Sequence, residues 1–429
     1  MRTDFTLAQL ADPDTRVAET ILRSCVHCGF CTATCPTYVL LGDELDSPRG
    51  RIYLIKDMLE QDRTPSPEVV KHIDRCLSCL GCMTTCPSGV NYMHLVDHGR
   101  RYIAERFVRK LPERLLRRLI ATVLPRPGLF RLALLGAALA RPLRRLLPGR
   151  LRTLLDLAPG AVHGPSSGER PQIFPAEGRR VKRVALLAGC VQPVLAPEIN
   201  AATIRLLTRH GCEVVQVAGA GCCGALTHHL GADAASYVRA NIDAFLAEAG
   251  RGGLDAIVSN AAGCGTMLKD YGFQLREDAG YAEKAGRVAA LARDVTELVE
   301  ELGLKPPVAH PAPRVAYHSA CSLQHGQRIH ALPKALLERA GFPVVEVPEA
   351  HLCCGSAGSY NLLQPALAGA LLARKLGNIA ATHPAVIAAG NIGCMTQLAS
   401  GTEVPVVHTA QLLDWATGGP RPEQLAREP

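Results

Sequence analysis

The 429 residues of this chain, 48% hydrophobic and only 4% aromatic, are enough for about two to four domains with cores built mainly from Leu, Ala and Val. Seventeen cysteines in a chain of this length exclude a short disulfide scaffold, and the first residues, with early acids and no apolar segment, are not typical of a secretory signal. We therefore expect reduced thiols in a reducing cytosol, where metal clusters rather than disulfides are typical, and a net charge of +8 that is unevenly spread.

Two copies of one cysteine motif follow a short helical lead-in at Arg16 to Arg23. The first copy runs from Cys25 to Pro36 and the second from Cys76 to Pro87, and each reads C-x2-C-x2-C-x3-C-P. This pattern binds pairs of 4Fe–4S clusters in bacterial ferredoxins, where three cysteines hold one cluster and the fourth usually ligates the other. We expect the first cluster to be held by Cys25, Cys28, Cys31 and Cys86, and the second by Cys76, Cys79, Cys82 and Cys35.

Zinc is the alternative metal, but it does not explain the third cysteine or the proline after the fourth, which both occur twice. Between the motifs, Tyr38 to Ile73 has helical apolar spacing. We therefore predict a mostly helical module with loops around the metal. Arg49, Arg51 and Arg75 either donate hydrogen bonds to cluster sulfurs or form surface salt bridges, and we expect the surface position.

The segment from Lys110 to Arg152 is strongly basic, and Glu113 is its only acid. Its longest uncharged run, Leu132 to Ala140, is far shorter than the ~20 residues that a spanning helix needs. Three interpretations are open: docking on an anionic membrane, packing on a partner subunit, or a solvated helical linker. We favour docking to a membrane or partner, and nucleic acid least, because Phe130 is the only aromatic residue. Ala158 to Gly178 is a predicted linker. The basic residues are Lys110, Arg114, Arg117, Arg118, Arg126, Arg131, Arg141, Arg144, Arg145, Arg150 and Arg152.

From Val181 onward the sequence repeats itself. The stretch from Val184 to Cys190 matches the stretch from Val315 to Cys321, and a Cys-Cys-Gly triplet occurs once in each copy. Three pairs of matching cysteines stand 131 residues apart and the fourth pair 130, which indicates an internal duplication. The matching thiols are Cys190 and Cys321, Cys222 and Cys353, Cys223 and Cys354, and Cys264 and Cys394.

Within each copy, short β-rich runs alternate with helical runs, which predicts a βαβαβ unit with a parallel sheet. The cysteines follow the carboxyl ends of strands, where open α/β sheets bind ligands, so all eight thiols should gather at one rim. The predicted strands are Val184–Ala188, Glu213–Ala218, Ala256–Ser259, Arg314–His318, Val344–Val347 and Ala385–Ala389. The predicted helices are Pro197–His210, Asp233–Ala249, Pro333–Ala340 and Pro365–Thr382.

An adjacent Cys-Cys-Gly differs from a single buried cysteine, because two neighbouring thiols cannot both point into one core. Four cysteines per copy suit one cluster in each half or one site between the halves, with inert structural thiols as the alternative. Cys212 has no counterpart and is expected to be a buried small hydrophobe. We expect His228, His229 and His325, near these loops, to be ordinary surface histidines rather than proton carriers. The Gly-rich stretch Gly219–Gly221 is expected to belong to a cysteine loop and not to a nucleotide-binding turn.

From its ferredoxin-type motifs to Trp415, the chain resembles the iron–sulfur subunits of glycolate oxidases. Its doubled Cys-Cys-Gly region is similar to the duplicated cysteine-rich (CCG) domain of heterodisulfide reductase-type proteins. That wider group includes subunits of anaerobic glycerol-3-phosphate dehydrogenases and of lactate utilisation systems. The full motif of heterodisulfide reductases ends in CxxC, but Met267 and Gln397 replace its last cysteine here. This argues against the non-cubane clusters of the full motif, though not against a four-cysteine site.

The resemblance implies an electron-transfer subunit with two 4Fe–4S clusters and a further iron–sulfur site in the repeats. It implies a membrane-associated complex in which a partner flavoprotein, holding FAD, oxidises glycolate or another 2-hydroxy acid. Electrons would pass to a quinone or another membrane acceptor on the inner face of the cell membrane, and this subunit would not oxidise the substrate by itself. The alternatives are a subunit of a lactate or glycerol-3-phosphate dehydrogenase, or a self-contained thiol reductase.

The predicted fold class is α+β multidomain, with a helical ferredoxin-type module before two tandem Rossmann-like repeats. We expect a ferredoxin module at residues 1–109, a basic helical segment and linker at 110–178, a first repeat at 179–306 and a second repeat at 307–429.

Overall fold

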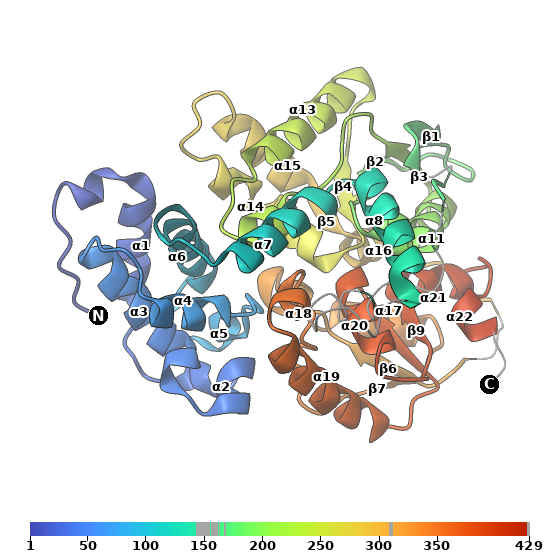
Figure 1. Cartoon of the computed structure of the whole chain (residues 1–429). Helices are drawn as coiled ribbons and strands as arrows, with labels where there is room; N and C mark the ends of the chain where they lie inside the picture. Colours follow the sequence, from blue (N-terminus) through green and yellow to red (C-terminus); the bar gives the residue numbers. More distant parts are fainter. Residues whose placement is uncertain (143–154, 156–161, 163, 167–168, 309–311, 427–429) are drawn as a thin grey trace.

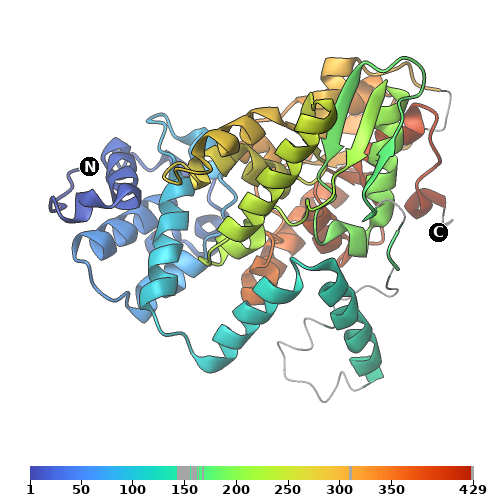
Figure 2. The ribbon, with the colours of Figure 1, turned by 90° about the horizontal axis from the view of Figure 1, so that it is seen from above.

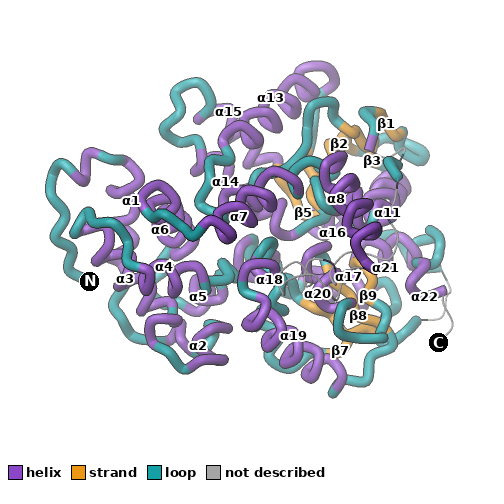
Figure 3. Tube along the Cα trace, viewed as in Figure 1, coloured by secondary structure: helices purple, strands orange, loops and turns teal. Residues whose placement is uncertain are grey.

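The computed structural model describes residues 1–142, 155, 162, 164–166, 169–308 and 312–426. The helical ferredoxin module lies at one end of the molecule, and the two repeats lie beside it (Figure 1). The strands gather in two separate sheets (Figure 3). Outside the described residues lie Arg144, Arg145, Arg150 and Arg152 of the basic segment and residues 158–161, 163 and 167–168 of the predicted linker.

Helices of the ferredoxin module begin at clear sequence signals. Asp12, Ser47 and Ser66 each cap a helix by accepting a backbone N–H, and each is followed by a proline. Proline fits the first helical position because its missing N–H would have no partner there. The helices enclose a core that includes Leu22, Ile55 and other buried apolar residues. The helices are α1 (Pro13–Ser24), α2 (Pro36–Leu41), α3 (Pro48–Glu60), α4 (Pro67–Asp74), α5 (Gly81–Thr85) and α6 (Tyr92–Arg106), with short 3-10 turns at Gln9–Ala11, Phe30–Thr32 and Glu44–Asp46.

The described part of the basic segment forms two helices, α7 (Leu111–Val123) and α8 (Pro127–Ala140), which extend along one side of the molecule (Figure 2). On α8, Phe130 and Leu134 are buried and pack with Val194 of the first repeat. Among the described residues, no helix combines the length and apolar composition needed to cross a bilayer.

The first repeat contains a five-stranded sheet in the order β1-β3-β2-β4-β5. Only β1 is antiparallel to its neighbour, and the other pairs are parallel. The strands are β1 (Gln172–Phe174), β2 (Lys182–Leu186), β3 (Cys212–Gln216), β4 (Ala256–Ser259) and β5 (Ala292–Asp294). The helices are α10 (Gln192–Leu195), α11 (Pro197–Arg209), α12 (Ala225–His229), α13 (Ala235–Gly252), α14 (Ala262–Gln274), α15 (Ala282–Leu291) and α16 (Val295–Leu302).

The second repeat contains an all-parallel sheet in the order β7-β6-β8-β9, which matches β3-β2-β4-β5 strand for strand. The duplication is thus one of topology as well as of sequence. The strands are β6 (Val315–His318), β7 (Val344–Val345), β8 (Val386–Ala389) and β9 (Val406–His408). The helices are α17 (Leu332–Arg339), α18 (Tyr360–Leu363), α19 (Pro365–Ala380), α20 (Ile392–Ala399), α21 (Thr409–Ala416) and α22 (Glu423–Ala426), with a one-turn helix at Ser322–Gly326.

The two repeats share one hydrophobic core. Val184 and Leu186 of β2 face the same apolar cluster as Val315 and Tyr317 of β6, because alternate residues of a strand lie on one face of its sheet. Ion pairs reinforce this contact, as Asp414 of α21 is 1% exposed and binds Arg205 and Arg209 of α11. The opposite faces of the two sheets pack in two further clusters, and the cluster on the second sheet also includes Ala196, Ile199 and Ala262 of the first repeat.

Candidate metal centres

The two ferredoxin-type motifs fold into loops with matching backbone turns. His27 and Gly29 in the first loop, and Ser78 and Leu80 at the matching positions of the second, all have positive φ angles between 50° and 86°. Non-glycine residues are strained in this left-handed region, and such strain persists only where the surroundings hold it. Turns of this kind direct neighbouring N–H groups towards one point, which suits an anionic cluster.

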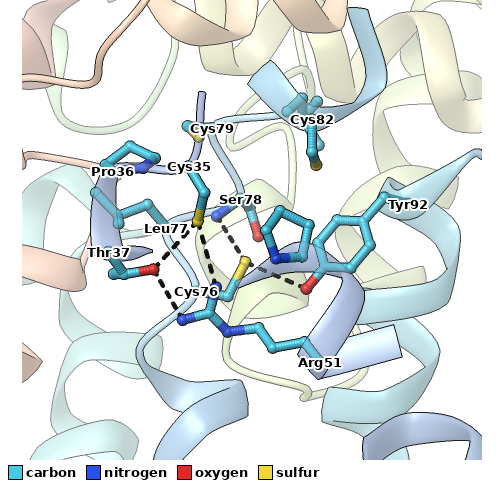
Figure 4. Close-up of a pocket in the computed structure, with 12 residues that line it drawn as sticks. Cys35, Pro36, Thr37, Arg51, Cys76, Leu77, Ser78, Cys79, Cys82 and Tyr92 are labelled. Atoms are coloured by element: carbon cyan, nitrogen blue, oxygen red, sulfur yellow. Dashed lines mark hydrogen bonds between the residues drawn. The ribbon is translucent and has the colours of Figure 1, made fainter. Parts of the chain in front are cut away.

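Cys35 of the first motif joins the cysteines of the second. Its thiol lines one small cavity together with Cys76, Cys79 and Cys82 (Figure 4). The hydroxyl of Tyr92 donates a hydrogen bond to the Cys76 sulfur at 3.8 Å. Four thiols around one space, with donors beside them, fit a 4Fe–4S cluster. The geometry therefore supports the expected second ligand set, and crossed ligation stays a prediction.

The first expected ligand set is closer to solvent. Cys28 is exposed, Cys31 and Cys86 are half-buried, and Cys25 is buried. Cys25 belongs to the core of the module, and Cys31 and Cys86 pack against that core. Burial raises the pKa of the Cys31 thiol to about 11. A bound metal would offset this effect, since a coordinating thiol is deprotonated outright.

Arg51 lies beneath the second cluster site and not on the surface. Its side chain is 1% exposed, and its Nη1 donates to the Cys35 sulfur at 3.7 Å (Figure 4). Its Nη2 binds Asp46, which is fully buried and also binds Arg75 at 2.7 Å. The expected surface position is therefore wrong for Arg51, because a buried carboxylate holds the guanidinium inside. It is right for Arg49, which pairs with a partly exposed glutamate.

In the first repeat, the four cysteines come together from three loops. Cys190 follows β2, Cys222 and Cys223 follow β3, and Cys264 lies in the first turn of α14. The sulfurs of Cys223 and Cys264 are 3.3 Å apart. Hydrogen bonds from Cys190 and Cys223 lower the pKa of Cys222 to about 4, whereas hydrogen bonding with Cys222 and burial raise the pKa of Cys190. Four thiols this close cannot all be thiolates at once, because their negative charges repel one another. A bound metal cation would compensate these charges and allow all four to be deprotonated.

The Cys-Cys-Gly turns of the two repeats have the same geometry. Gly224 and Gly355 both have a φ of 91°, and their N–H groups donate to the sulfurs of Cys222 and Cys353 at 3.4 Å. A Cβ added to Gly355 would lie 2.5 Å from the carbonyl oxygen of Ala368. Glycine is therefore needed both for the left-handed turn and for the close approach of α19.

Seven of the eight thiols in the repeats line one cavity of about 300 Å³. The eighth, Cys354, is fully buried and is not among the residues that line this cavity, so the expectation of a common rim holds for seven. The seven are Cys190, Cys222, Cys223, Cys264, Cys321, Cys353 and Cys394.

Cys354 instead faces His318, the last residue of β6. The ligand atoms of His318, Cys354 and Cys394 all lie within 4.8 Å of one another, and all three residues are buried. Burial and then the nearby Lys375 lower the pKa of His318 to about 3, so its imidazole is neutral. His318 is not among the site residues that the sequence patterns predict. The available signal was that it stands where the first repeat has Leu187.

The second ferredoxin site adjoins the second repeat. Cys79 packs against an apolar cluster that contains Cys321 and Cys353, and it lines the same cavity as those two thiols. The hydroxyl of Tyr360 donates to the backbone oxygen of Arg75 at 3.1 Å, which fixes α18 against the loop. The second ferredoxin site therefore lies directly beside the thiols of the second repeat.

Two of the three histidines expected on the surface are buried at the boundary of the ferredoxin module. Nε2 of His228 lies 3.1 Å from a carboxylate oxygen of Asp97 in α6. Nδ1 of His325 lies 2.7 Å from the hydroxyl of Thr84. The surface expectation is therefore wrong for both, because contacts between segments far apart in sequence cover them. His229 is partly exposed.

Two further expectations concern β3 and the loop that follows it. Gly219–Gly224 does spell G-x-G-x-x-G, but the helix after it, α12, has only five residues, and two thiols occupy the loop. A dinucleotide site needs a longer helix start at this point, so the stretch is a cysteine loop, as expected. Cys212 is buried in the shared core, also as expected.

Family models match three segments of the chain. Residues 21–90 match the "4Fe-4S dicluster domain", and residues 184–269 and 315–399 each match the "Cysteine-rich domain". These segments contain the ferredoxin-type loops and the two four-cysteine groups.

Sequence relatives extend over the whole chain. The "Glycolate oxidase iron-sulfur subunit" of Escherichia coli is 44% identical over 97% of this chain and 99% of its own length. The "Probable glycolate oxidase iron-sulfur subunit" of Bacillus subtilis is 32% identical over 94% and 96%. "Lactate utilization protein A" of Geobacillus thermodenitrificans is 27% identical over 54% of this chain and 98% of its own. A hypothetical protein from Helicobacter pylori shares the fold, with a TM-score of 0.55 at 10% identity over 97% of this chain and 74% of that one.

Proposed function

Because the chain belongs to the family of glycolate oxidase iron–sulfur subunits, we propose that it carries electrons from a partner flavoprotein to a quinone in the membrane. The flavoprotein would hold FAD and oxidise glycolate or a similar 2-hydroxy acid to the 2-oxo acid. This chain would accept the two electrons one at a time, because iron–sulfur clusters are one-electron carriers.

The observation that carries the proposal is that Cys79 packs against the cluster that contains Cys321 and Cys353 and lines the same cavity as these two thiols. In the proposed wiring, Cys79 ligates the second ferredoxin cluster, and the other two belong to a centre in the second repeat. Electrons could then leave the module directly into the repeats. The more exposed first cluster, with Cys28 at the surface, suits the entry from the flavoprotein.

In this proposal the ferredoxin module (residues 1–109) holds two 4Fe–4S clusters, and each repeat (179–306 and 307–429) holds an iron–sulfur centre. Thiolates are the ligands that such clusters use. The ligand sets are Cys25, Cys28, Cys31 and Cys86; Cys76, Cys79, Cys82 and Cys35; Cys190, Cys222, Cys223 and Cys264; and Cys321, Cys353, Cys354 and Cys394.

The cavity between the repeats supports a lipophilic acceptor. Its volume of about 300 Å³ lies at the lower end of the usual range for small-molecule sites. Thiols of both repeats line it, and Leu124 from the connection between α7 and α8, with Phe130 and Leu134 from α8, lines another part. A quinone ring bound there would contact apolar side chains and lie beside both proposed centres.

The outer faces of α7 and α8 support docking on an anionic membrane. Leucines at helical spacing are more than half exposed on both helices, and Arg114 and Arg118 of α7 are exposed beside them. An exposed apolar stripe flanked by cations is typical of helices that lie on anionic lipid surfaces. Helix α8 and the connection that precedes it border the cavity, so a lipid-soluble acceptor would have a short path to it. The leucines are Leu111, Leu115, Leu119, Leu132, Leu135 and Leu139.

The test is anaerobic purification of the chain with its native partners, followed by substrate reduction. Glycolate should bleach the flavin and then produce the EPR signals of this chain's clusters, with L-lactate, D-lactate and glycerol 3-phosphate as comparison substrates. The isolated chain should take up more than about eight irons, because the two ferredoxin clusters alone account for eight, and it should not oxidise glycolate. Clusters that stay oxidised in the complex under glycolate, or substrate oxidation by the isolated chain, would contradict the proposal.

A further inference from the structure

The two repeats differ at one position that faces the four-cysteine group. His318 ends β6, and Leu187 holds the corresponding place directly after β2. Leu187 is 2% exposed and packs in an apolar cluster with Ala185, two residues before it. His318 lies on the same face of its own sheet as Ala316, so the duplication places an imidazole where the first repeat has an alkyl group.

No hydrogen bond to a described residue accounts for the buried Nε2 of this imidazole. His318 is 2% exposed, and its Nε2 has no hydrogen-bond partner among the residues that the structure describes. A buried polar atom without a partner carries a desolvation cost, which proteins usually avoid. The first repeat avoids that cost with Leu187, so an alkyl side chain is compatible with this fold.

The surroundings of the imidazole are those of a metal ligand. A ligand atom of His318 lies within 4.8 Å of the sulfurs of Cys354 and Cys394. Metal–sulfur bonds of about 2.3 Å and metal–nitrogen bonds of about 2.1 Å place two ligands of one ion roughly 3.5–4 Å apart. Small side-chain movements would therefore bring all three groups onto one metal.

We propose that His318 supplies a nitrogen ligand to the metal centre of the second repeat, alongside Cys354 and Cys394. The centre of the first repeat then has sulfur ligands alone, because Leu187 offers none. This inference rests on the proposal that the second repeat holds a metal centre.

A mixed ligand set gives the two centres different reduction potentials. Imidazole is neutral whereas thiolate is anionic, and replacement of cysteine by histidine raises the potential in Rieske-type clusters. The second-repeat centre, which adjoins Cys79, is accordingly the one that draws electrons from the ferredoxin module. The first-repeat centre lies across the cavity at a lower potential.

The experiment uses the full chain, reconstituted without oxygen and labelled with ¹⁵N-histidine. Pulsed EPR of the reduced protein should show a strongly coupled nitrogen that changes with the isotope, in addition to the signals of the two ferredoxin clusters. His318→Leu, which introduces the residue of the first repeat, should remove that coupling. His318→Cys keeps a ligand, so it should keep the centre, lose the nitrogen coupling and lower the midpoint potential.

The matched control is His325→Gln. Both ring nitrogens of His325 already have partners, in Thr84 and in the backbone oxygen of His351, so this variant should keep the coupling. A centre beyond the ferredoxin clusters without a strongly coupled nitrogen would overturn the role of His318 alone. Iron and sulfide that account only for the two ferredoxin clusters would overturn the metal centre itself, and His318 with it.

Discussion

The guanidinium of Arg51 lies 3.7 Å from the sulfur of Cys35, and the same side chain binds the buried carboxylate of Asp46. The residue therefore joins a proposed cluster ligand to a buried ion-pair network. Its positive charge favours the reduced form of a nearby cluster, because reduction adds a negative charge.

Arg51→Met should lower the midpoint potential of the second ferredoxin cluster and destabilise the chain by about 3–5 kcal/mol, since Asp46 loses a buried partner. Arg51→Lys, which keeps the charge, should restore most of the potential. Redox titration followed by EPR and urea unfolding measure the two effects. Arg63→Gln is the control, because that arginine forms an exposed pair with Asp57 and should change stability by less than about 1 kcal/mol. An unchanged potential in Arg51→Met would show that the guanidinium has no electronic effect on the cluster.

Cys82→Ser and Cys86→Ser should damage different clusters, although the two residues are only four positions apart. Cys82 shares a cavity with Cys35, whereas Cys86 is expected to complete the set of Cys25, Cys28 and Cys31. EPR of the reduced single variants distinguishes the two signals, and Cys35→Ser should resemble Cys82→Ser. Loss of the same signal in Cys82→Ser and Cys86→Ser would show that each motif ligates its own cluster.

Arg114→Glu with Arg118→Glu should weaken binding of the full chain to anionic vesicles by at least roughly tenfold, because each basic residue near such a surface contributes about 1 kcal/mol. Leu115→Gln with Leu119→Gln should also weaken it, since both leucines are more than half exposed on α7. Cosedimentation with vesicles measures both, and salt should weaken wild-type binding.

The control for membrane binding is Leu7→Gln, which removes another exposed leucine that lies outside α7 and α8. Unchanged vesicle binding in the arginine and leucine variants, combined with loss of the flavoprotein on purification, would assign these helices to a protein partner instead.

Asp97→Asn should destabilise the chain more at pH 6 than at pH 9. Burial alone would lower the pKa of His228, but Asp97 outweighs this effect and raises it above its ordinary 6.5. The contribution of a group with a raised pKa is complete below its unfolded value and is lost as the pH rises through the folded value. Burial alone would raise the pKa of Asp97, but His228 and His229 outweigh this effect and lower the pKa well below its ordinary 3.8. The contribution of the Asp97 carboxylate to stability is therefore lost only at a pH well below 3.8.

The measurement is urea unfolding of wild type, Asp97→Asn and His228→Gln between pH 6 and 9. The difference between wild type and either variant should be about 1–3 kcal/mol at pH 6 and should shrink towards pH 9. A difference that is independent of pH would show that the pair contributes through packing alone.

Much of the architecture could be predicted because it depends on local sequence patterns. The paired motifs predicted the ferredoxin module, and the regular offsets of Cys190, Cys222 and Cys264 predicted two α/β repeats, which the structure confirms. Strand β5 and strand β9 were not predicted, since three residues carry too little periodicity. The antiparallel strand β1 lies within the predicted linker, and its three residues are likewise too few to show a strand pattern.

What the sequence did not reveal depends on contacts between distant segments. Arg51 is buried because Asp46 is buried beside it, and His325 is covered because Thr84 lies against it. No spacing rule links residues from separate modules. The partnership of His318 with Cys354 likewise exists only once the end of β6 and the Cys-Cys-Gly loop are folded together.

The core shared by the repeats has a consequence for biosynthesis. Leu186 packs in the same cluster as Trp415, which lies close to the end of the chain. Domains generally fold from the N-terminus onward during translation, but this core can close only after the segment that contains Trp415 has left the ribosome. The ferredoxin module can therefore fold and receive its clusters early. The first repeat must wait with one sheet face uncovered, which makes the late stage of synthesis the point most exposed to aggregation.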